Sequence, residues 1–333
     1  MRVLLTFFRR IALGVAYGAA GGAILGFLGF ASPYLDLFNH LQLLMFLALV
    51  AALAATPVLT RAGVARNFFV SIVATGFVAS SAIFIPELTS SFAPRPALPT
   101  DGRPVLTVMT HNIFGLNYDM AGFDRYVASV NPDIVALQEF FPEQSAELTP
   151  LLKTRYPFHV TCEGGKRANI GLFSKLPFVQ TIDGACARRL AKGERTAHII
   201  ARFQPENGEA FTLVTTHLDW PVPVQRQRDE YAALASVLNG IAGPLMVMGD
   251  FNSTPWSYAQ RDFVSMTGLT RHTRNLPTFP ALWWYANDWR PALPILPLDH
   301  VMTRDGITVH SLATGAMTGS DHLPVVFSFS VGE

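Results

Sequence analysis

The chain has 333 residues, enough for about two domains, and half of them are hydrophobic. Residues 1–100 hold six of the 25 Lys and Arg residues and two of the 24 Asp and Glu residues, so this part carries +4 and the remainder −3. The acidic remainder lacks the basic balance of domains that grip a nucleic-acid backbone, which argues against a nuclease without excluding one.

Three long apolar runs fill the first hundred residues. They are Ile11–Ala31, Leu41–Leu59 and Phe68–Ile85, and each is long enough, or nearly so, to cross the roughly 30 Å hydrocarbon core of a membrane as a helix. A cleaved signal peptide is the alternative, because arginines precede the first run. A secretory apolar region has only about 7 to 15 residues, however, and two further runs follow here. We therefore predict three transmembrane helices.

Four glycines recur at every fourth position of the first run: Gly14, Gly18, Gly22 and Gly26. This spacing places them on one face of a helix, where small residues let another helix approach closely. The neighbour is either another helix of the same chain or a second copy, so both intramolecular packing and self-association stay open. The oligomeric state does not follow from the sequence.

Basic residues in the short loops predict the orientation. Three arginines precede the first run, none lies between the first and second, where Asp36 is found, and Arg61 and Arg66 lie between the second and third. Because positive loops stay in the cytoplasm, we expect a multi-pass protein of the inner (plasma) membrane with its N-terminus inside. The part after the third helix then faces the periplasm or the exterior.

We divide the chain into a transmembrane anchor (1–86), a linker (87–104) and an exported domain (105–332). The linker is rich in proline and serine, which disfavour regular structure. Both cysteines, Cys162 and Cys186, lie in the exported domain, where two thiols can pair. Whether they form a disulfide stays open, and they lack the spacing of a zinc site.

The exported domain begins with a strand, Val105–Met109, a helix, Ala121–Val130, and a second strand, Ile134–Leu137. Shorter strands separated by turn residues follow, and a helix over Val224–Leu238 precedes a further strand, Pro244–Met248. The remaining predicted strands are Phe158–Thr161, Asn169–Ser174, Thr196–Phe203, Phe211–His217, one starting at Leu298 and Val325–Ser330. Alternation of strands and helices indicates an α/β domain.

Polar side chains stand where many of these strands end or begin, namely Asn112, Glu139, His217, Asp250, Asn252, Asp299, Asp321 and His322. They offer oxygen and imidazole groups and no thiol. Few hard oxygen ligands suit Mg²⁺ or Mn²⁺, which also bind substrate phosphate oxygens. The set therefore indicates a metal-assisted phosphoester hydrolase, in which an Asp or His handles the proton of the attacking water.

Six short motifs in this order resemble the endonuclease/exonuclease/phosphatase superfamily, whose fold is deoxyribonuclease I-like. They are Thr110-His111-Asn112, Leu137-Gln138-Glu139, Thr216-His217-Leu218, Gly249-Asp250-Phe251-Asn252, Leu298-Asp299-His300 and Gly319-Ser320-Asp321-His322. The membrane-spanning N-terminus is similar to a bacterial membrane-associated branch. The resemblance implies a four-layer α-β-β-α sandwich of two packed mixed sheets over about residues 103–332, preceded here by three transmembrane helices.

The resemblance also implies roles for the site residues. Glu139, Asn112 and Asp321 would hold the metal, and Asp250 would orient or deprotonate the attacking water. His322, aligned by Asp299, would contact the scissile phosphate, and His217 would protonate or stabilise the leaving oxygen. Asn112, Asn252, His217 and His322 would bind the phosphate. Whether one metal or two take part is open.

The substrate also stays open among nucleic acid, lipid head groups and small phosphodiesters or phosphomonoesters. An aromatic segment, Ala281–Pro297, precedes Asp299 and is interpreted as a pocket wall, a membrane-surface belt or a loop packed on its own domain. A membrane-anchored phosphoester-binding module or scaffold without turnover is the alternative function. Unused buried carboxylates would burden stability, which argues for the enzyme.

Overall fold

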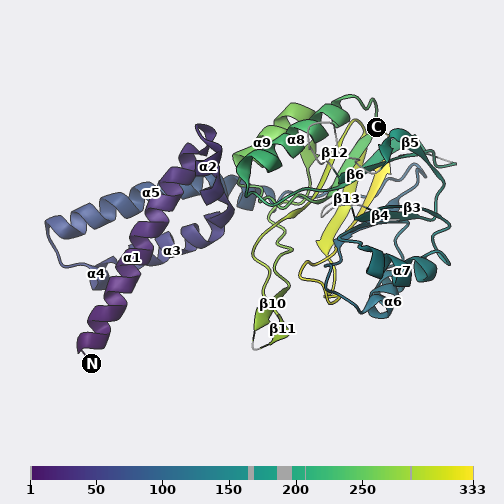
Figure 1. Cartoon of the computed structure of the whole chain (residues 1–333). Helices are drawn as coiled ribbons and strands as arrows, with labels where there is room; N and C mark the ends of the chain where they lie inside the picture. The colour runs from purple at the N-terminus through teal and green to yellow at the C-terminus, as the bar shows by residue number, and fades with distance from the viewer. Residues whose placement is uncertain (1, 164–168, 186–196, 207, 286, 333) are drawn as a thin grey trace. The chain divides into compact units, whose positions relative to one another are not determined.

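In a computed structural model of the protein, the described residues are 2–163, 169–185, 197–206, 208–285 and 287–332 (Figure 1). They form two compact units, Met1–Phe92 with Thr254–Asp262, and Ala93–Ser253 with Phe263–Glu333. Cys162 ends a strand in the second unit, but Cys186 lies outside the described residues, so their pairing stays open.

Three long apolar helices form most of the first unit, as predicted. They are α1 (Arg2–Phe27), α3 (Gln42–Ala54) and α5 (Val64–Ser90). By length and composition, the spans Val3–Phe30, Pro33–Ala54 and Val64–Ser90 can each cross a membrane. Short helices join them: η1 (Leu28–Phe30), α2 (Pro33–Asp36), η2 (Leu37–Leu41) and α4 (Thr56–Leu59).

Small residues bring these helices into close contact. A side chain at Gly76 of α5 would meet the Cα of Ala20 in α1 at 2.5 Å, and one at Gly22 would meet the sulfur of Met45 in α3 at 2.8 Å. Side chains at Gly14 and Gly18 would meet nothing within 4 Å among the described residues. The glycine face therefore serves packing within the chain at Gly22, and self-association stays a hypothesis.

Helix α5 continues to Ser90, so the predicted end of the anchor at residue 86 falls inside it. Pro86 lacks a backbone N–H, yet the last turn stays helical, because side chains satisfy its free carbonyls. The Thr89 hydroxyl donates to the carbonyl of Ile85 at 3.0 Å, and that of Ser90 donates to the carbonyl of Glu87 at 2.9 Å.

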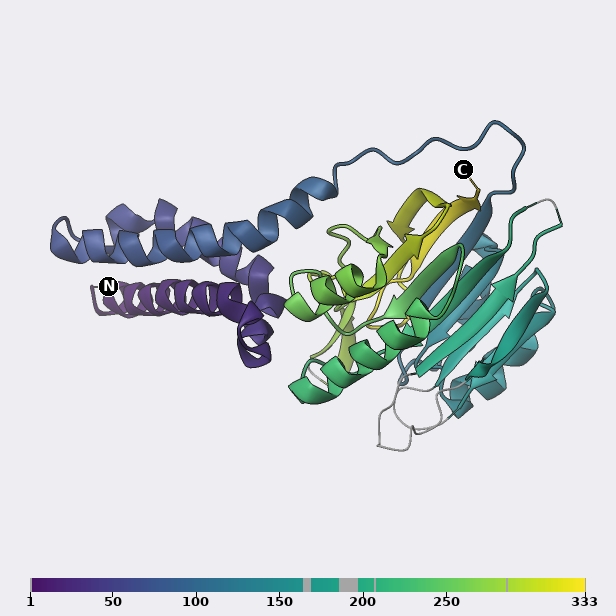
Figure 2. The same cartoon turned by 90° about the horizontal axis from the view of Figure 1, so that it is seen from above.

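The second unit stacks two mixed sheets between helices, which confirms the predicted fold (Figures 1 and 2). The first sheet has the order β13-β14-β1-β2-β4-β3 and the second β5-β6-β7-β8-β12-β9, each six-stranded. Helices α6 and α7 lie on the outer face of the first sheet, and α8 lies on that of the second (Figure 1).

The element bounds of the second unit are β1 (Leu106–Asn112), α6 (Met120–Val130), β2 (Ile134–Gln138), α7 (Pro142–Leu152), β3 (Phe158–Cys162), β4 (Ile170–Ser174), β5 (Phe178–Ala185), β6 (Ala197–Phe203), β7 (Phe211–His217), α8 (Val224–Asn239), β8 (Leu245–Asp250), α9 (Tyr258–Thr267), β9 (Thr270–Arg271), β10 (Leu282–Tyr285), β11 (Asp288–Pro291), β12 (Asp299–Arg304), β13 (Ile307–Thr314) and β14 (Val325–Val331). Helix α9 is shared, since its first residues belong to the first unit.

Buried apolar side chains from both sheets fill the space between them. Val108 and Phe327 of the first sheet and Leu213 and Met246 of the second are almost fully buried in one cluster. Strands covered on both faces consist of nearly continuous hydrophobic runs, which made most of them predictable. This core fixes the strand ends that carry the polar residues.

The structure differs from the sequence expectations at helix α7 and in the aromatic segment. Helix α7 was not predicted, because its sequence is polar and contains Pro150. The aromatic segment is not a loop throughout, since β10 and β11 form an antiparallel hairpin in which Trp284 pairs with Trp289. The hairpin extends away from the two sheets (Figure 1).

Candidate active site

The predicted site residues meet at one edge of the two sheets. Strands β1 and β2 run parallel, as do β7 and β8, so their carboxyl ends lie together. Asn112, His217 and Asp250 are each the last residue of a strand, and Glu139 follows directly after β2. Strand β12 runs antiparallel to β8, so its first residue, Asp299, reaches the same edge and pairs in register with Asp250.

Asp250 is the centre of this cluster and is fully buried. Its Oδ2 accepts a hydrogen bond from Asn112 Nδ2 at 2.9 Å, and its Oδ1 accepts one from the Asn252 amide at 2.8 Å. Two imidazoles approach Oδ2, with His217 Nε2 at 3.5 Å and His322 Nε2 at 3.8 Å. Burial raises the pKa of Asp250 to about 7, although the charge of His322 opposes this.

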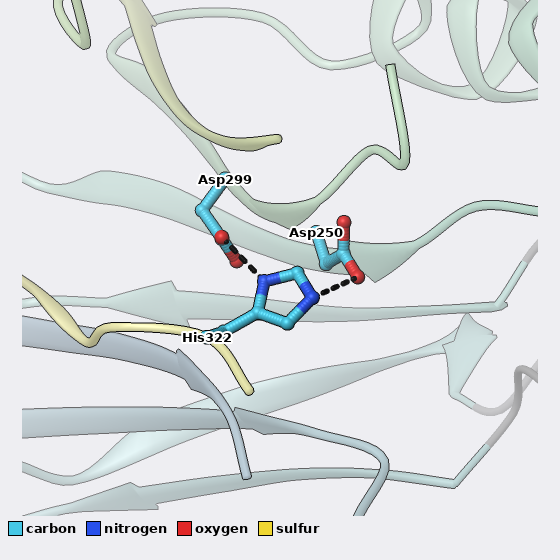
Figure 3. A group of neighbouring side chains, drawn as sticks. All are labelled: Asp250, Asp299 and His322. Atoms are coloured by element: carbon cyan, nitrogen blue, oxygen red, sulfur yellow. Dashed lines mark hydrogen bonds and ion pairs between the residues drawn. The ribbon is translucent and has the colours of Figure 1, made fainter. Parts of the chain in front are cut away.

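His322 lies between two carboxylates (Figure 3). Its Nδ1 is 2.8 Å from Asp299 Oδ2, and its Nε2 faces Asp250. Burial alone would lower the pKa of His322, but the charges of Asp299 and Asp250 outweigh it and raise the pKa to about 10. The imidazole is therefore held as a cation whose Nδ1–H donates to Asp299, a partner that fixes the orientation of the ring.

The backbone after β8 is shaped to bring Asp250 and Asn252 together. Gly249 has φ of +138°, and a Cβ there would come 2.0 Å from the carbonyl oxygen of Thr216, so only glycine fits. Asn252 is left-handed, with φ of +47°. Its Nδ2 donates to the carbonyl of Leu218 at 2.9 Å and lies 3.3 Å from His217 Nε2. The Oδ1 atom of Asn252 is buried and has no hydrogen-bond partner among the described residues.

Glu139 and Asp321 form the acidic side of the site. Glu139 has φ of +53°, and its Oε2 accepts a hydrogen bond from the Gly115 amide at 2.9 Å. A left-handed non-glycine residue is strained, and such strain gathers at functional sites. Burial raises the pKa of Asp321 to about 6; the charge of His322 opposes this and that of Glu139 adds to it. Two carboxylates that repel each other fit a hard divalent cation.

A second group, Asp250, Asp299 and His322, also brings ligand atoms within 4.8 Å of one another. This buried group could hold a metal by its geometry. Its imidazole is already paired with both carboxylates, however, and a metal ligand must be a neutral imidazole. Both groups therefore offer carboxylate oxygens to a divalent cation.

The sequence assigned no role to two residues that lie next to the site. The Ser320 hydroxyl donates to the carbonyl of Asn112 at 2.6 Å and accepts from the His322 amide at 3.0 Å, so it joins the last loop to β1. The ring of Phe279 lies 5.0 Å from that of His322. The Gly-Ser-Asp-His motif contained the first signal, whereas the second contact has no local sequence signature.

Three other histidines have hydrogen-bond partners outside this cluster. His111 Nε2 is 2.7 Å from the Thr318 hydroxyl, His300 Nε2 donates to the Ser253 carbonyl at 2.9 Å, and His310 Nε2 is 2.9 Å from the Ser330 hydroxyl. Burial lowers the pKa of both His111 and His300 to about 3.

Aromatic residues surround the cluster. The Phe114 ring, two residues after Asn112, lies 5.0 Å from Trp289 of the hairpin, and Trp220 lies 6.1 Å from Phe279. Trp283 and Trp284 of β10 are more than half exposed. Exposed aromatic side chains offer an apolar contact surface to a ligand or another molecule.

The matching family model is described as Endonuclease/Exonuclease/phosphatase family and covers residues 109–322. A UPF0294 protein of Vibrio campbellii is 29% identical over 137 residues, which are 40% of this chain and 45% of that protein. The chain thus matches less than half the length of such relatives.

Two solved structures share the fold. An endonuclease/exonuclease/phosphatase from Beutenbergia cavernae has 20% identity and a TM-score of 0.55, over 69% of this chain and 72% of that one. D. rerio TDP2 complexed with single strand DNA product has 16% identity and a TM-score of 0.54, over 68% and 99%. At these identities the likeness shows the fold alone.

Proposed function

Since the chain belongs to the endonuclease/exonuclease/phosphatase family, we propose that it is a membrane-anchored, divalent-metal-dependent phosphoesterase whose catalytic unit acts outside the cytoplasm. The observation that carries the proposal is the buried arrangement of Asp250 between two imidazoles and two amides, with Asp299 behind His322. A buried carboxylate with several imidazole neighbours is costly for stability and is retained where it has a chemical role.

Each side chain has a role that its contacts support. Asp250 accepts the proton of the attacking water, because its carboxylate is the only one in contact with both imidazoles and both amides among the described site residues. His322, oriented by Asp299, donates to a phosphate oxygen. His217 donates to the leaving oxygen from the other side of Asp250.

Asn112 and Asn252 hold the phosphate in place. Their side-chain amides already point at Asp250, so a phosphate bound there meets donors fixed before the reaction begins. Glu139, Asp321 and Asn112 would hold a Mg²⁺ or Mn²⁺ ion. When bound, that ion supplies positive charge that neutralises the phosphoryl oxygens.

The aromatic residues around the site favour a substrate with an apolar or aromatic group next to its phosphate. The acidic balance of the exported part offers little attraction to a long polyanion. We therefore propose lipid head groups and small phosphodiesters as the first substrates to test. Nucleic acid is the alternative, because the structurally similar TDP2 was solved with a DNA product.

The test is a hydrolysis assay with the detergent-solubilised full chain and Mg²⁺ or Mn²⁺. The substrates are plasmid DNA, phosphatidylinositol phosphates, sphingomyelin and a simple aryl phosphodiester. We expect hydrolysis of at least one substrate, abolished by EDTA and restored by the metal. Absence of turnover on all of them by the metal-bound protein would instead favour a binding module or scaffold.

A further inference from the structure

The segment Thr254–Asp262 belongs to the compact unit formed by the N-terminal helices. It begins two residues after Asn252 and contains the first residues of α9. Asp36, at the end of α2, binds the start of this helix. Its Oδ1 accepts from the Tyr258 amide at 2.8 Å, and its Oδ2 accepts from the Ala259 amide and the Ser257 hydroxyl, both at 3.1 Å.

These bonds make Asp36 a cap for α9. The first amides of a helix have no partner within the helix, and the helix dipole favours negative charge there. A capping side chain normally comes from the residue just before the helix. Here it comes from 222 positions upstream, from the stretch that joins the first two apolar helices.

The cap itself is rigidly held. Asp36 is 6% exposed, and Asn39 Nδ2 donates to its Oδ1 at 2.8 Å and to the carbonyl of Gly26 at 2.9 Å. A buried carboxylate that accepts this many hydrogen bonds is fixed in orientation. Displacing it would leave both the helix amides and the charge unsatisfied.

Further contacts join the same segment to three of the N-terminal helices. The Thr254 amide donates to His40 Nδ1 at 3.3 Å, and the Tyr258 hydroxyl donates to the carbonyl of Phe27 at 2.9 Å. Trp256 is 1% exposed, and its ring lies 5.7 Å from that of Phe84. The segment is thus bound along its length.

Few residues separate this segment from the candidate active site. Asp250 is the last residue of β8, Asn252 is left-handed, and the Ser253 carbonyl accepts from His300. Thr254, the next residue, already contacts His40. Only Ser253 lies between Asn252 and Thr254 in the chain, so the covalent link between the turn and the segment is short.

We propose that Asp36 is a positioning residue for the phosphoesterase site: by capping α9 it holds Thr254–Asp262 and so sets the position of the turn that carries Asp250 and Asn252. The N-terminal helices are then part of the working enzyme as well as its anchor. The expected effect of Asp36 on catalytic rate rests on the proposed function. Its expected effect on the position of the turn does not.

The experiment compares the full chain in detergent micelles with its Asp36→Ala variant. The matched control is Thr56→Ala, which removes a buried hydrogen bond to the Ala52 carbonyl within the same helices. Hydrogen exchange is measured at residues 250–262. Turnover of an aryl phosphodiester with Mn²⁺ gives kcat and KM, and Mn²⁺ binding is titrated directly.

For Asp36→Ala we expect exchange at the Tyr258 and Ala259 amides to speed up about tenfold or more, with the increase reaching Asn252. We expect kcat to fall about tenfold or more with KM and Mn²⁺ affinity nearly unchanged, because a displacement of about 1 Å at a catalytic group can cost on the order of a hundredfold. Asp36→Asn keeps an acceptor oxygen, and Asn also caps helices well. This variant should therefore recover part of the amide protection and part of the kcat that Asp36→Ala loses.

Faster exchange that stops at Thr254, or a kcat equal to that of Thr56→Ala, would overturn the positioning role. If the wild-type chain hydrolyses no phosphoester at all, the proposed function fails instead. In that case, hydrogen exchange at Asn252 still shows whether Asp36 sets the position of the turn.

Discussion

At Asp250, burial and neighbouring charge act in opposite directions. Burial raises its pKa, the cation of His322 lowers it, and the carboxylate of Asp299 raises it again. The Asp250 and Asp299 carboxylates share the one imidazole that lies between them (Figure 3). The function of each residue therefore depends on the others. A single substitution should reduce activity by more than the loss of one hydrogen bond would.

Asp299→Asn tests this dependence. An amide oxygen can still accept from His322 Nδ1, but the negative charge that holds the imidazole cation is lost. We expect kcat to fall about 10- to 100-fold, the range seen when partners that orient functional histidines are changed. Steady-state kinetics measures this, and melting of the variant near the wild-type temperature shows that folding is intact. A kcat within twofold of wild type would contradict the role of Asp299.

His300 gives a prediction for stability against pH. Its pKa is lowered to about 3 in the folded protein, mainly by burial, whereas an unfolded histidine has a pKa of about 6.5. As the pH falls below 6.5, the unfolded chain binds the proton first, so stability decreases down to about pH 3. The slope from this residue is about 1.4 kcal/mol per pH unit.

Urea unfolding between pH 6 and 4 measures that slope. His300→Gln keeps a donor for the Ser253 carbonyl but removes the titrating group. The unfolding free energy of this variant should therefore fall less steeply as the pH is lowered, by about 1.4 kcal/mol per pH unit relative to the wild type. Parallel curves for the two proteins would show that His300 does not contribute.

The sequence predicts one group of candidate site residues, because most of them stand next to a strand end within a short motif. Asp250 and Asn252 follow an apolar run through Gly249, and Glu139 follows another. Their neighbours were harder to find. Ser320 lies within the Gly-Ser-Asp-His motif, but its bonds to backbone groups cannot be read from that motif, and the contact of Phe279 with His322 spans a long sequence separation.

At the scale of elements, strands buried on both faces were easier to predict than helices or edge strands. The strand β2 is apolar up to its last residue, Gln138, and β8 is apolar up to Gly249. By contrast, α7 and α9 have mixed polar sequences, and β13 alternates buried and partly exposed residues at a sheet edge. Their structure depends on tertiary contacts, including the long-range cap from Asp36 at α9.

The β10–β11 hairpin gives an element-scale prediction. Trp283 is 55% exposed, so Trp283→Ala should change the free energy of unfolding by no more than about 0.5 kcal/mol. Phe263→Ala in α9 is the contrast, because Phe263 is fully buried and its loss should cost about 3 to 5 kcal/mol. Denaturant unfolding compares the two. A large cost at Trp283 would show that the hairpin serves folding rather than contact with a ligand.

For the whole molecule, the distribution of arginines predicts the orientation in the membrane. A reporter enzyme that works only outside the cytoplasm, fused after Pro104, should be active. One that works only in the cytoplasm should be active when fused after Arg61, which lies between the second and third helices. Cytoplasmic activity of the Pro104 fusion would reverse the topology and place the active site inside the cell.

The central claim is that Asp250 and its neighbours hydrolyse a phosphoester with the help of a divalent cation. The most direct test is the initial rate of phosphodiester hydrolysis by the full chain and by Asp250→Asn, each with Mn²⁺ and with EDTA. The wild type should be active only with the metal, and the variant should lose at least about a hundredfold of that rate, the scale of a lost general base. A folded variant that keeps a rate near that of the wild type, or a wild type equally active in EDTA, would contradict the account.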